Sequence, residues 1–302
     1  MVWKANRRCR CKPKRRIAEE NHHAAHPGPG RPGISSLQKV PKGYRPSENM
    51  KDFETRIDAE TERNLRIRRL AKCAHQGDWG DAARCLRCRL LQEDGRTSWP
   101  TLASPTYCRH LRQVVIGNLH KVLDQNWPGK CVFVTLVRND WARHPGDLHD
   151  VDLDSWKRAL RKSITDRLKG DSGWIFLWFE ASYDPVHQCY QFHAHGIATG
   201  DYVDAVEALN GSRAFRPWAN LRGIPDCSKP VDCEPVQLED LPRPIAYSLK
   251  SFWKLRNSGW KVRLDGDEHT RMLLFLDEHR PEDFCLMIGI SVRDGRFVIR
   301  DE

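Results

Sequence analysis

Apolar residues recur at helical spacing along three stretches in the first half of the chain. These stretches span residues 51–74, 81–92 and 106–125. Each places its apolar residues on one side of a helix, as expected for helices that bury one face. The pattern therefore predicts a mainly helical region over 49–127.

The pattern changes after residue 128, where short β-branched and aromatic runs predict strands. We expect strands at 131–137, 174–180, 188–198 and 231–238, and a C-terminal hairpin formed by 285–292 and 297–300. We expect helices at 155–169, 201–209, 241–256 and 267–278. The order β-α-β-β-α-β predicts an α+β fold over 128–302, in which helices cover one face of an antiparallel sheet.

Charge is concentrated at the N-terminus. The chain has 302 residues and a formal net charge of +10, which suggests a polyanionic partner such as nucleic acid. Residues 1–50 hold 12 of the 50 basic residues but only 3 of the 40 acidic ones. The Pro- and Gly-rich run 26–33 cannot form a helix or a central strand. We interpret 1–48 as a disordered basic tail, which either contacts phosphates or only aids solubility.

Composition also excludes several protein classes. No run approaches the roughly 18 apolar residues of a membrane span, so a transmembrane protein is excluded and no membrane partner is expected. The basic N-terminus is not followed by the apolar segment of a signal peptide. The odd count of 11 cysteines, without an export signal, argues against a secreted disulfide scaffold. We therefore expect a cytoplasmic protein.

Two histidines share one face of a predicted strand. His193 and His195 are two residues apart, so their imidazoles project from the same face and can bind one cation. Glu180 ends the preceding strand and can lie opposite the pair if the two strands form a hairpin. Two imidazoles and a carboxylate suit Mg²⁺ or Mn²⁺ engaging a phosphate. The alternative is a pair of hydrogen-bonded core histidines beside an exposed acid.

Tyr247 and Lys250 are three residues apart on a predicted helix and therefore neighbours on one face. A tyrosine can attack a phosphodiester and become covalently attached to it. It needs assistance, because an unperturbed phenol has a pKa of about 10. A nearby ammonium can neutralise negative charge at the phosphate. The alternative is a packing tyrosine beside a solvated lysine.

Three segments together resemble a known family. They are Val132-Phe-Val-Thr-Leu136, Phe192-His-Ala-His-Gly-Ile-Ala198 and Pro244-Ile-Ala-Tyr-Ser-Leu-Lys250. Their order resembles the HUH endonucleases, specifically the rolling-circle replication initiators with a single catalytic tyrosine. The resemblance covers roughly 130–255. Ser251 stands where some relatives carry a second tyrosine, and Ala194 is smaller than the usual residue between the histidines.

The resemblance implies a sheet of the HUH type, similar to an RRM-like palm, and a metal-dependent transesterification on single-stranded DNA. His193, His195 and Glu180 would be metal ligands, Tyr247 the nucleophile and Lys250 its helper. The reaction would leave a 5′-phosphotyrosine and a 3′-hydroxyl that can prime the replication of a plasmid or phage. Single-stranded or supercoiled origin DNA would be the substrate, with a host helicase and polymerase as partners.

Other residues are candidates for DNA or zinc binding. The basic helix 155–169 and the segment after Tyr247 offer phosphate contacts and base stacking. The candidates are Lys157, Arg158, Arg161, Lys162, Trp253 and Lys254. The alternatives are a solvated helix face for 155–169 and a core position for Trp253. A zinc site with the ligands Cys73, His75, Cys85 and Cys88 is a less favoured alternative to a packed helical hairpin in which the cysteines act as small hydrophobes.

Two other functions share these features. A single-tyrosine transposase of the same superfamily would use the same chemistry on a different DNA. A non-catalytic DNA-binding regulator on the same fold would bind without cleaving. Binding alone requires neither the histidine pair nor Tyr247, so the enzyme is the favoured hypothesis.

Overall fold

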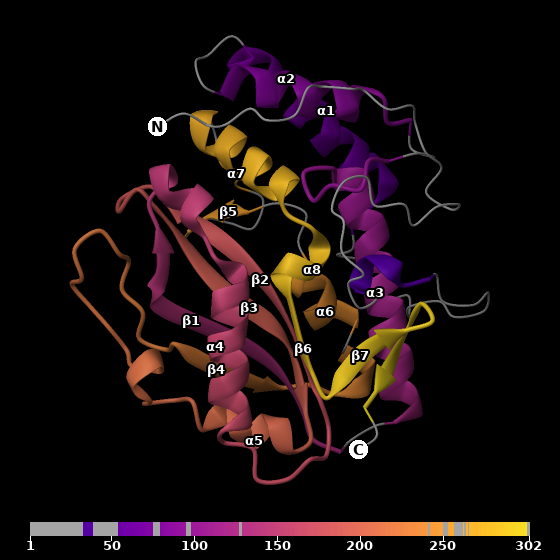
Figure 1. Ribbon diagram of the computed structural model, residues 1–302, viewed down its shortest axis with the longest axis vertical. Helices are drawn as coiled ribbons and strands as arrows, with labels where there is room; N and C mark the ends of the chain where they lie inside the picture. Colours follow the sequence, from indigo (N-terminus) through magenta and orange to yellow (C-terminus); the bar gives the residue numbers. More distant parts are fainter. Residues whose placement is uncertain are drawn as a thin grey trace.

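A computed structural model describes most of the chain. The described residues are 33–38, 54–74, 79–94, 98–126, 129–240, 242–249, 253–256, 262, 264 and 266–300. They form an α+β structure with an antiparallel sheet and several helices, which confirms the predicted fold class (Figure 1).

Six strands form the main sheet. They are β1 (Cys131–Arg143), β2 (Ile175–Asp184), β3 (Cys189–Thr199), β4 (Val231–Pro235), β5 (Lys254–Leu255) and β6 (Cys285–Ile288). The spatial order is β4-β1-β3-β2-β5, and β6 also pairs with β2. All of these pairings are antiparallel except the short parallel pairing of β2 with β5.

Helices precede, interrupt and follow these strands. They are α1 (Arg56–Cys73), α2 (Gly80–Leu91), α3 (Pro105–Gln125), α4 (Leu153–Thr165), α5 (Asp201–Glu207), α6 (Pro242–Ser248), α7 (Gly266–Glu278) and α8 (Pro281–Phe284). Short 3-10 turns lie at η1 (Ile34–Ser36), η3 (Pro145–Asp150), η4 (Arg213–Phe215) and η5 (Leu238–Asp240). Thr55 caps the N-terminus of α1, and its side chain forms a capping box with Asp58. None of the described helices has both the length and the apolar character of a membrane span.

The two faces of the sheet are covered by different helices. Trp156 of α4 packs on Phe192, with ring centroids 5.3 Å apart, whereas Tyr247 of α6 packs on His195 at 5.5 Å. Phe192 and His195 are three residues apart in β3 and therefore point to opposite faces. The prediction that helices cover one face is thus wrong, because α4 and α6 lie on opposite sides of the sheet (Figure 1).

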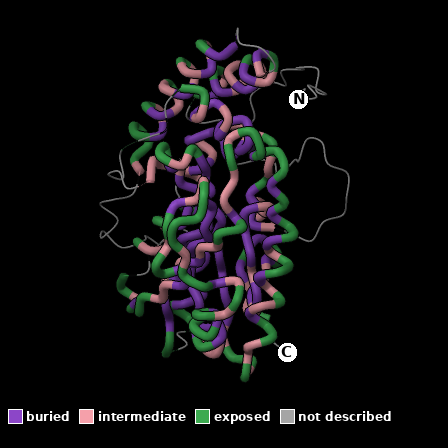
Figure 2. Tube along the Cα trace, turned by 90° about the vertical axis from the view of Figure 1, so that its left-hand side faces the viewer, coloured by how far each residue is buried: buried purple, intermediate pink, exposed green. Residues whose placement is uncertain are grey.

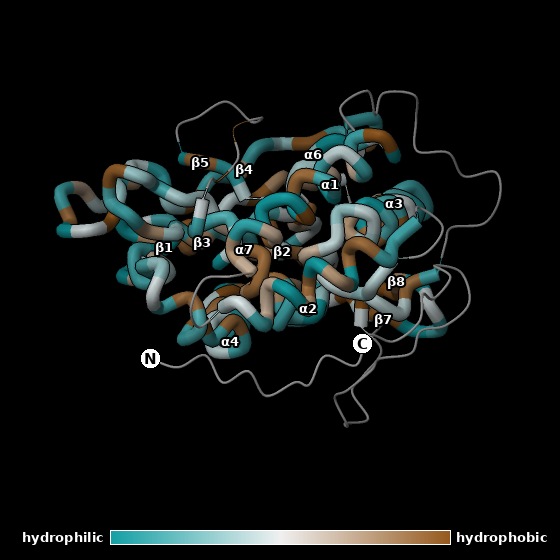
Figure 3. The backbone as a smooth tube through the Cα atoms, turned by 90° about the horizontal axis from the view of Figure 1, so that it is seen from above, coloured by the Kyte–Doolittle hydropathy of each residue, from teal (hydrophilic) through white to brown (hydrophobic). Residues whose placement is uncertain are grey.

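The face under α4 is the more completely buried one. Along β1, Val132, Val134 and Leu136 are buried, while Phe133 and Thr135 on the other face are half-buried. Figure 2 shows buried segments running through the strands and exposed ones on the outer loops, and in Figure 3 hydrophobic residues gather near the middle of the molecule. The α6 face of β1 therefore stays partly open to solvent.

The helix predicted over 241–256 is wrong beyond Ser248, where α6 ends. Trp253 is 4% exposed and packs against Tyr190 and Phe192, on the face opposite α6. A single helix cannot place Tyr247 on one face and Trp253 on the other. Burial of the Trp253 indole therefore favours a path in which the backbone leaves α6 and crosses the edge of β2.

The predicted strand 285–292 is divided in two. Gly289 has a φ of 71°, a conformation that favours glycine, and it separates β6 from β7 (Ile290–Arg293). Strand β6 joins the main sheet, whereas β7 pairs with β8 (Arg296–Ile299) in a separate hairpin. This hairpin lies beside α3 (Figure 1).

Part of the predicted disordered tail is ordered. The residues 33–38 form a turn in which Ile34 is 1% exposed. The backbone N–H of Ser35 donates to Glu282 Oε1 of α8 at 2.8 Å, and the Ser35 hydroxyl bonds to the same oxygen. The prediction of disorder over 1–48 is therefore wrong for these residues, and its other parts lie outside the described residues.

Replacing Ile34 by alanine should lower the free energy of unfolding by about 2–5 kcal/mol, because a buried aliphatic side chain is removed. Ile57 in α1 is 74% exposed and provides a matched control. The substitution Ile57→Ala should change stability by less than about 0.5 kcal/mol. Urea denaturation of both variants measures the difference. Equal stabilities would show that residues 33–38 do not dock in solution.

Candidate metal centre

Strand register brings Glu180, His193 and His195 together on the α6 face. Glu180 in β2 lies directly opposite His193 in β3, and Thr135 in β1 lies opposite His195. Directly opposed residues in an antiparallel sheet project from the same face. The three predicted ligands therefore share one rigid platform.

The three side chains form a compact, buried cluster. His193 Nε2 lies 2.9 Å from Glu180 Oε1, and His195 Nε2 lies 3.2 Å from the same oxygen. One ligand atom from each residue lies within 4.8 Å of the others. Glu180 is 3% exposed, His193 9% and His195 6%. Polar groups are costly to bury unless they are paired, and in this cluster the carboxylate and the two imidazoles contact one another.

The other nitrogen of each imidazole is also engaged. His193 Nδ1 lies 3.2 Å from the backbone oxygen of Gln191, and His195 Nδ1 lies 2.8 Å from Thr135 Oγ1. Contacts of this kind fix the orientation of metal-ligating histidines. They leave both Nε2 atoms directed at Glu180.

The contact between His193 and Glu180 suits a bound cation. The Glu180 carboxylate only accepts hydrogen bonds, so each contacting Nε2 either carries a proton or shares a cation with the carboxylate. The donor set, two imidazole nitrogens and one carboxylate oxygen, therefore fits a divalent metal ion.

Tyr247 lies at the exposed side of this cluster. Its ring centroid is 5.5 Å from that of His195 and 6.1 Å from that of Phe133, which stacks on His195. Tyr247 is 41% exposed, unlike the ligands. The phenol is therefore accessible to a solvent-borne substrate beside the three ligands.

Close approach of β2 and β3 depends on Gly196, which follows the histidine pair. A Cβ atom at this position would lie 1.9 Å from the backbone oxygen of Phe176. Any larger residue would push the two strands apart. The glycine after His195 therefore helps to hold Glu180 opposite His193.

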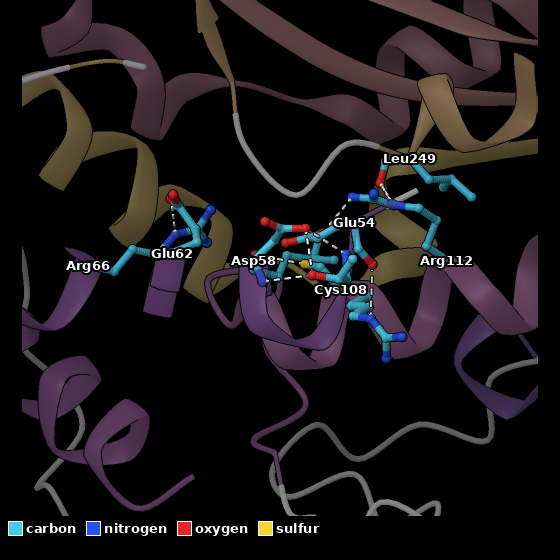
Figure 4. A network of polar contacts seen from close by, with 10 residues as sticks. Glu54, Asp58, Glu62, Arg66, Cys108, Arg112 and Leu249 are labelled. Carbon is cyan, nitrogen blue, oxygen red and sulfur yellow. Dashed lines mark hydrogen bonds and ion pairs between the residues drawn. The ribbon is translucent and has the colours of Figure 1, made fainter. Parts of the chain in front are cut away.

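A buried arginine links α3 to the site. Arg112 Nε donates to the backbone oxygen of Leu249, just after α6, at 2.7 Å. Its Nη2 lies 3.3 Å from Glu54 Oε2 (Figure 4). Burial lowers the pKa of Arg112, and the negative charges of Glu54 and Glu180 oppose this shift. Arg112 therefore fixes the end of α6 and contributes positive charge near Glu180.

Other tyrosines near the site are poorly placed for attack. Tyr183 and Tyr190 lie on the α4 face, where their rings contact each other with centroids 5.0 Å apart. Burial raises the pKa of both phenols. Tyr247 is therefore the tyrosine that the sheet places beside the ligands.

The DNA-binding candidates on α4 lie on the opposite face from the cluster. Lys157 donates to the backbone oxygen of Glu282, and Arg161 donates to that of Met287. Both side chains thus brace α4 against its neighbours. Arg158 and Lys162 are exposed, and their contact with DNA stays a prediction.

Two further candidates adjoin α6. Of the two alternatives for Trp253, base stacking is contradicted by its burial, and the core position is confirmed. Lys254, by contrast, lies near Tyr247 on the site face, with Nζ 6.0 Å from the ring centroid. Lys250 lies outside the described residues.

The zinc candidates are only partly described, because His75 lies outside the described residues. Cys73 is buried and accepts a hydrogen bond from Thr270 of α7. Cys85 and Cys88 are half-buried on α2. Among the described residues, the group with metal-ligand spacing is Glu180, His193 and His195.

Sequence reasoning missed two contributors. Gln191 contributes its backbone oxygen to His193, so its side chain gives no sequence signal of this contact. Arg112 and Glu180 are more than sixty residues apart in the sequence. No local signal on α3 distinguishes it from a solvated arginine.

Comparison with known proteins assigns no family. No protein-family model, curated protein or solved structure matches the chain. What the site does must therefore be inferred from its own residues and their contacts.

Mn²⁺ should bind the protein without DNA, and His193→Ala should abolish this binding because one of three ligands is lost. Thr135→Val should weaken binding about 10–100-fold, the usual cost of removing a partner of a ligating histidine. His187, which contacts Asp184 at the β2–β3 turn, provides the control His187→Ala. Isothermal titration calorimetry on folded variants measures the affinities. Unchanged affinity in His193→Ala would exclude this metal site.

Proposed function

We propose that this protein is a metal-dependent endonuclease and strand transferase that acts on single-stranded DNA through Tyr247. One observation carries the proposal: an accessible tyrosine adjoins a buried Glu-His-His cluster on one face of the sheet. A protein that binds DNA without cleaving it would need no tyrosine beside such a cluster. We propose that it acts in the rolling-circle replication of a plasmid or phage.

In the proposed reaction, the Tyr247 oxygen attacks the phosphorus of a phosphodiester. A Tyr–O–P bond forms, the bond from phosphorus to the 3′-oxygen breaks, and the phenolic proton passes in net to that oxygen. The products are a 5′-phosphotyrosine and a 3′-hydroxyl. Attack of a 3′-hydroxyl on the phosphotyrosine reverses the reaction and rejoins the strand. Because the phosphotyrosine bond replaces the phosphodiester bond, joining needs no ATP.

Each residue of the site has a role in this reaction. Glu180, His193 and His195 would hold Mg²⁺ or Mn²⁺, and a bound divalent cation polarises the scissile phosphate. Thr135 and Gln191 hold the imidazoles in orientation. Arg112 holds the end of the helix that carries Tyr247. The rigid strands keep these groups positioned before substrate arrives.

The resemblance to the HUH initiators supports the same proposal. Its second motif supplies the two histidines, and its third supplies Tyr247. The α+β structure with an antiparallel sheet supports this proposal. The proposal therefore includes an HUH-type palm as the scaffold of the reaction.

A trapping experiment tests the proposal. The protein is incubated with Mn²⁺ and a pool of random-sequence DNA single strands labelled at the 3′ end. A 5′-phosphotyrosine retains the labelled fragment on the protein through denaturing electrophoresis. We expect labelled protein from the wild type and a loss of more than about 100-fold in Tyr247→Phe, because the nucleophile is removed.

Tyr183→Phe is the matched control, because Tyr183 lies on the opposite face. It should label like the wild type. Label that persists in Tyr247→Phe would contradict the role of Tyr247. Cleavage without any adduct would indicate a metal hydrolase, and binding without cleavage would indicate a DNA-binding regulator.

A further inference from the structure

Lys254 lies on the same face of the sheet as the metal ligands. It pairs with Ser182 in the short parallel ladder between β5 and β2. Ser182 is two residues from Glu180 in the same strand, so both project from the α6 face. Residues in register on neighbouring strands share a face, and Lys254 therefore projects there as well.

The neighbours of Lys254 hold this orientation. Trp253 points to the opposite face, where it packs against Phe192 and Phe275 with ring centroids 5.3 and 5.6 Å apart. Beyond the ladder, the backbone N–H of Arg256 donates to the backbone oxygen of Tyr183 at 2.8 Å. The buried indole of Trp253 before Lys254 and the backbone hydrogen bond of Arg256 after it hold this part of the chain in place.

The ammonium of Lys254 approaches Tyr247. Its Nζ lies 6.0 Å from the centroid of the Tyr247 ring, at the outer limit of a cation–π contact. Among the described residues, no carboxylate forms an ion pair with Lys254. Lys162 on α4, by contrast, is paired with Asp166. Lys254 thus brings uncompensated positive charge to the side of the accessible phenol.

We propose that Lys254 is a catalytic residue of the phosphoryl transfer, acting beside or in place of Lys250. This inference rests on the proposed function. As the Tyr247 oxygen bonds to phosphorus and the 3′-oxygen leaves, negative charge develops on the non-bridging phosphate oxygens. The ammonium donates hydrogen bonds to these oxygens and remains protonated throughout, so it supplies charge and transfers no proton.

The position of Lys254 suits a role in the transition state more than in binding. It is a strand-borne cation beside the proposed nucleophile, whereas most of the basic surplus of the chain lies in residues 1–50. A cation that acts where charge develops raises the rate of the chemical step. Loss of its charge should therefore reduce the rate far more than the affinity for DNA.

Single-turnover kinetics test this role. A DNA strand selected from the trapping pool is used at saturating concentration with Mn²⁺, and the rate of adduct formation is measured. Lys254→Gln should lower this rate by about 100-fold, the typical effect of removing one stabilising donor. Lys254→Arg should recover part of the rate, because it restores the charge. Lys130→Gln, which removes an exposed cation paired with Asp204 of α5, should react like the wild type.

Affinity for the same strand, measured by fluorescence anisotropy with Ca²⁺ in place of Mn²⁺, should change less than about threefold in Lys254→Gln. A rate within twofold of the wild type would overturn the role of Lys254 and leave the proposed function intact. An equal fall in rate and in affinity would overturn it as well, because Lys254 would then only bind DNA. Absence of any adduct from the wild type would overturn the proposed function and this inference together.

Discussion

The site depends on the register between β2 and β3, which sets Glu180 directly opposite His193. A shift of one residue would send one of the two side chains to the other face of the sheet. The register is held by buried apolar neighbours on the α4 face and by Gly196, which permits the close approach of the strands. The apolar core thus determines where three polar groups meet. Because these groups are buried, their contacts favour a cation among them.

The second constraint is the passage of the chain around the edge of β2. The buried indole of Trp253 and the helix that carries Tyr247 lie on opposite faces, so the chain cannot stay helical between them. The same constraint turns Lys254 back toward the face of the metal ligands. Arg112 adds a link from α3 to the end of α6, so the N-terminal helices help to position the tyrosine. Tyr247, the three candidate ligands and Lys254 therefore come together because of packing between distant segments.

Much of this arrangement could be predicted from the sequence, because it depends on local periodicity. The fold class and the shared face of His193 and His195 follow from the alternation of residues along strands. The end of α6 could not be predicted, because it is set by tertiary burial of Trp253 rather than by helix propensity. The division of the C-terminal strand at Gly289 and the role of Arg112 likewise depend on distant contacts. Local signals predicted the candidate residues, and long-range packing determined which of them lie together.

The central claim is that Glu180, His193 and His195 together bind one divalent cation beside Tyr247. Anomalous diffraction from crystals of the protein loaded with Mn²⁺ tests it most directly. The account predicts one strong peak about 2.0–2.3 Å from Glu180 Oε1 and from both Nε2 atoms. Both Nδ1 atoms should keep their contacts with Thr135 and Gln191. A peak bound elsewhere, with the three side chains still in mutual contact, would contradict the account.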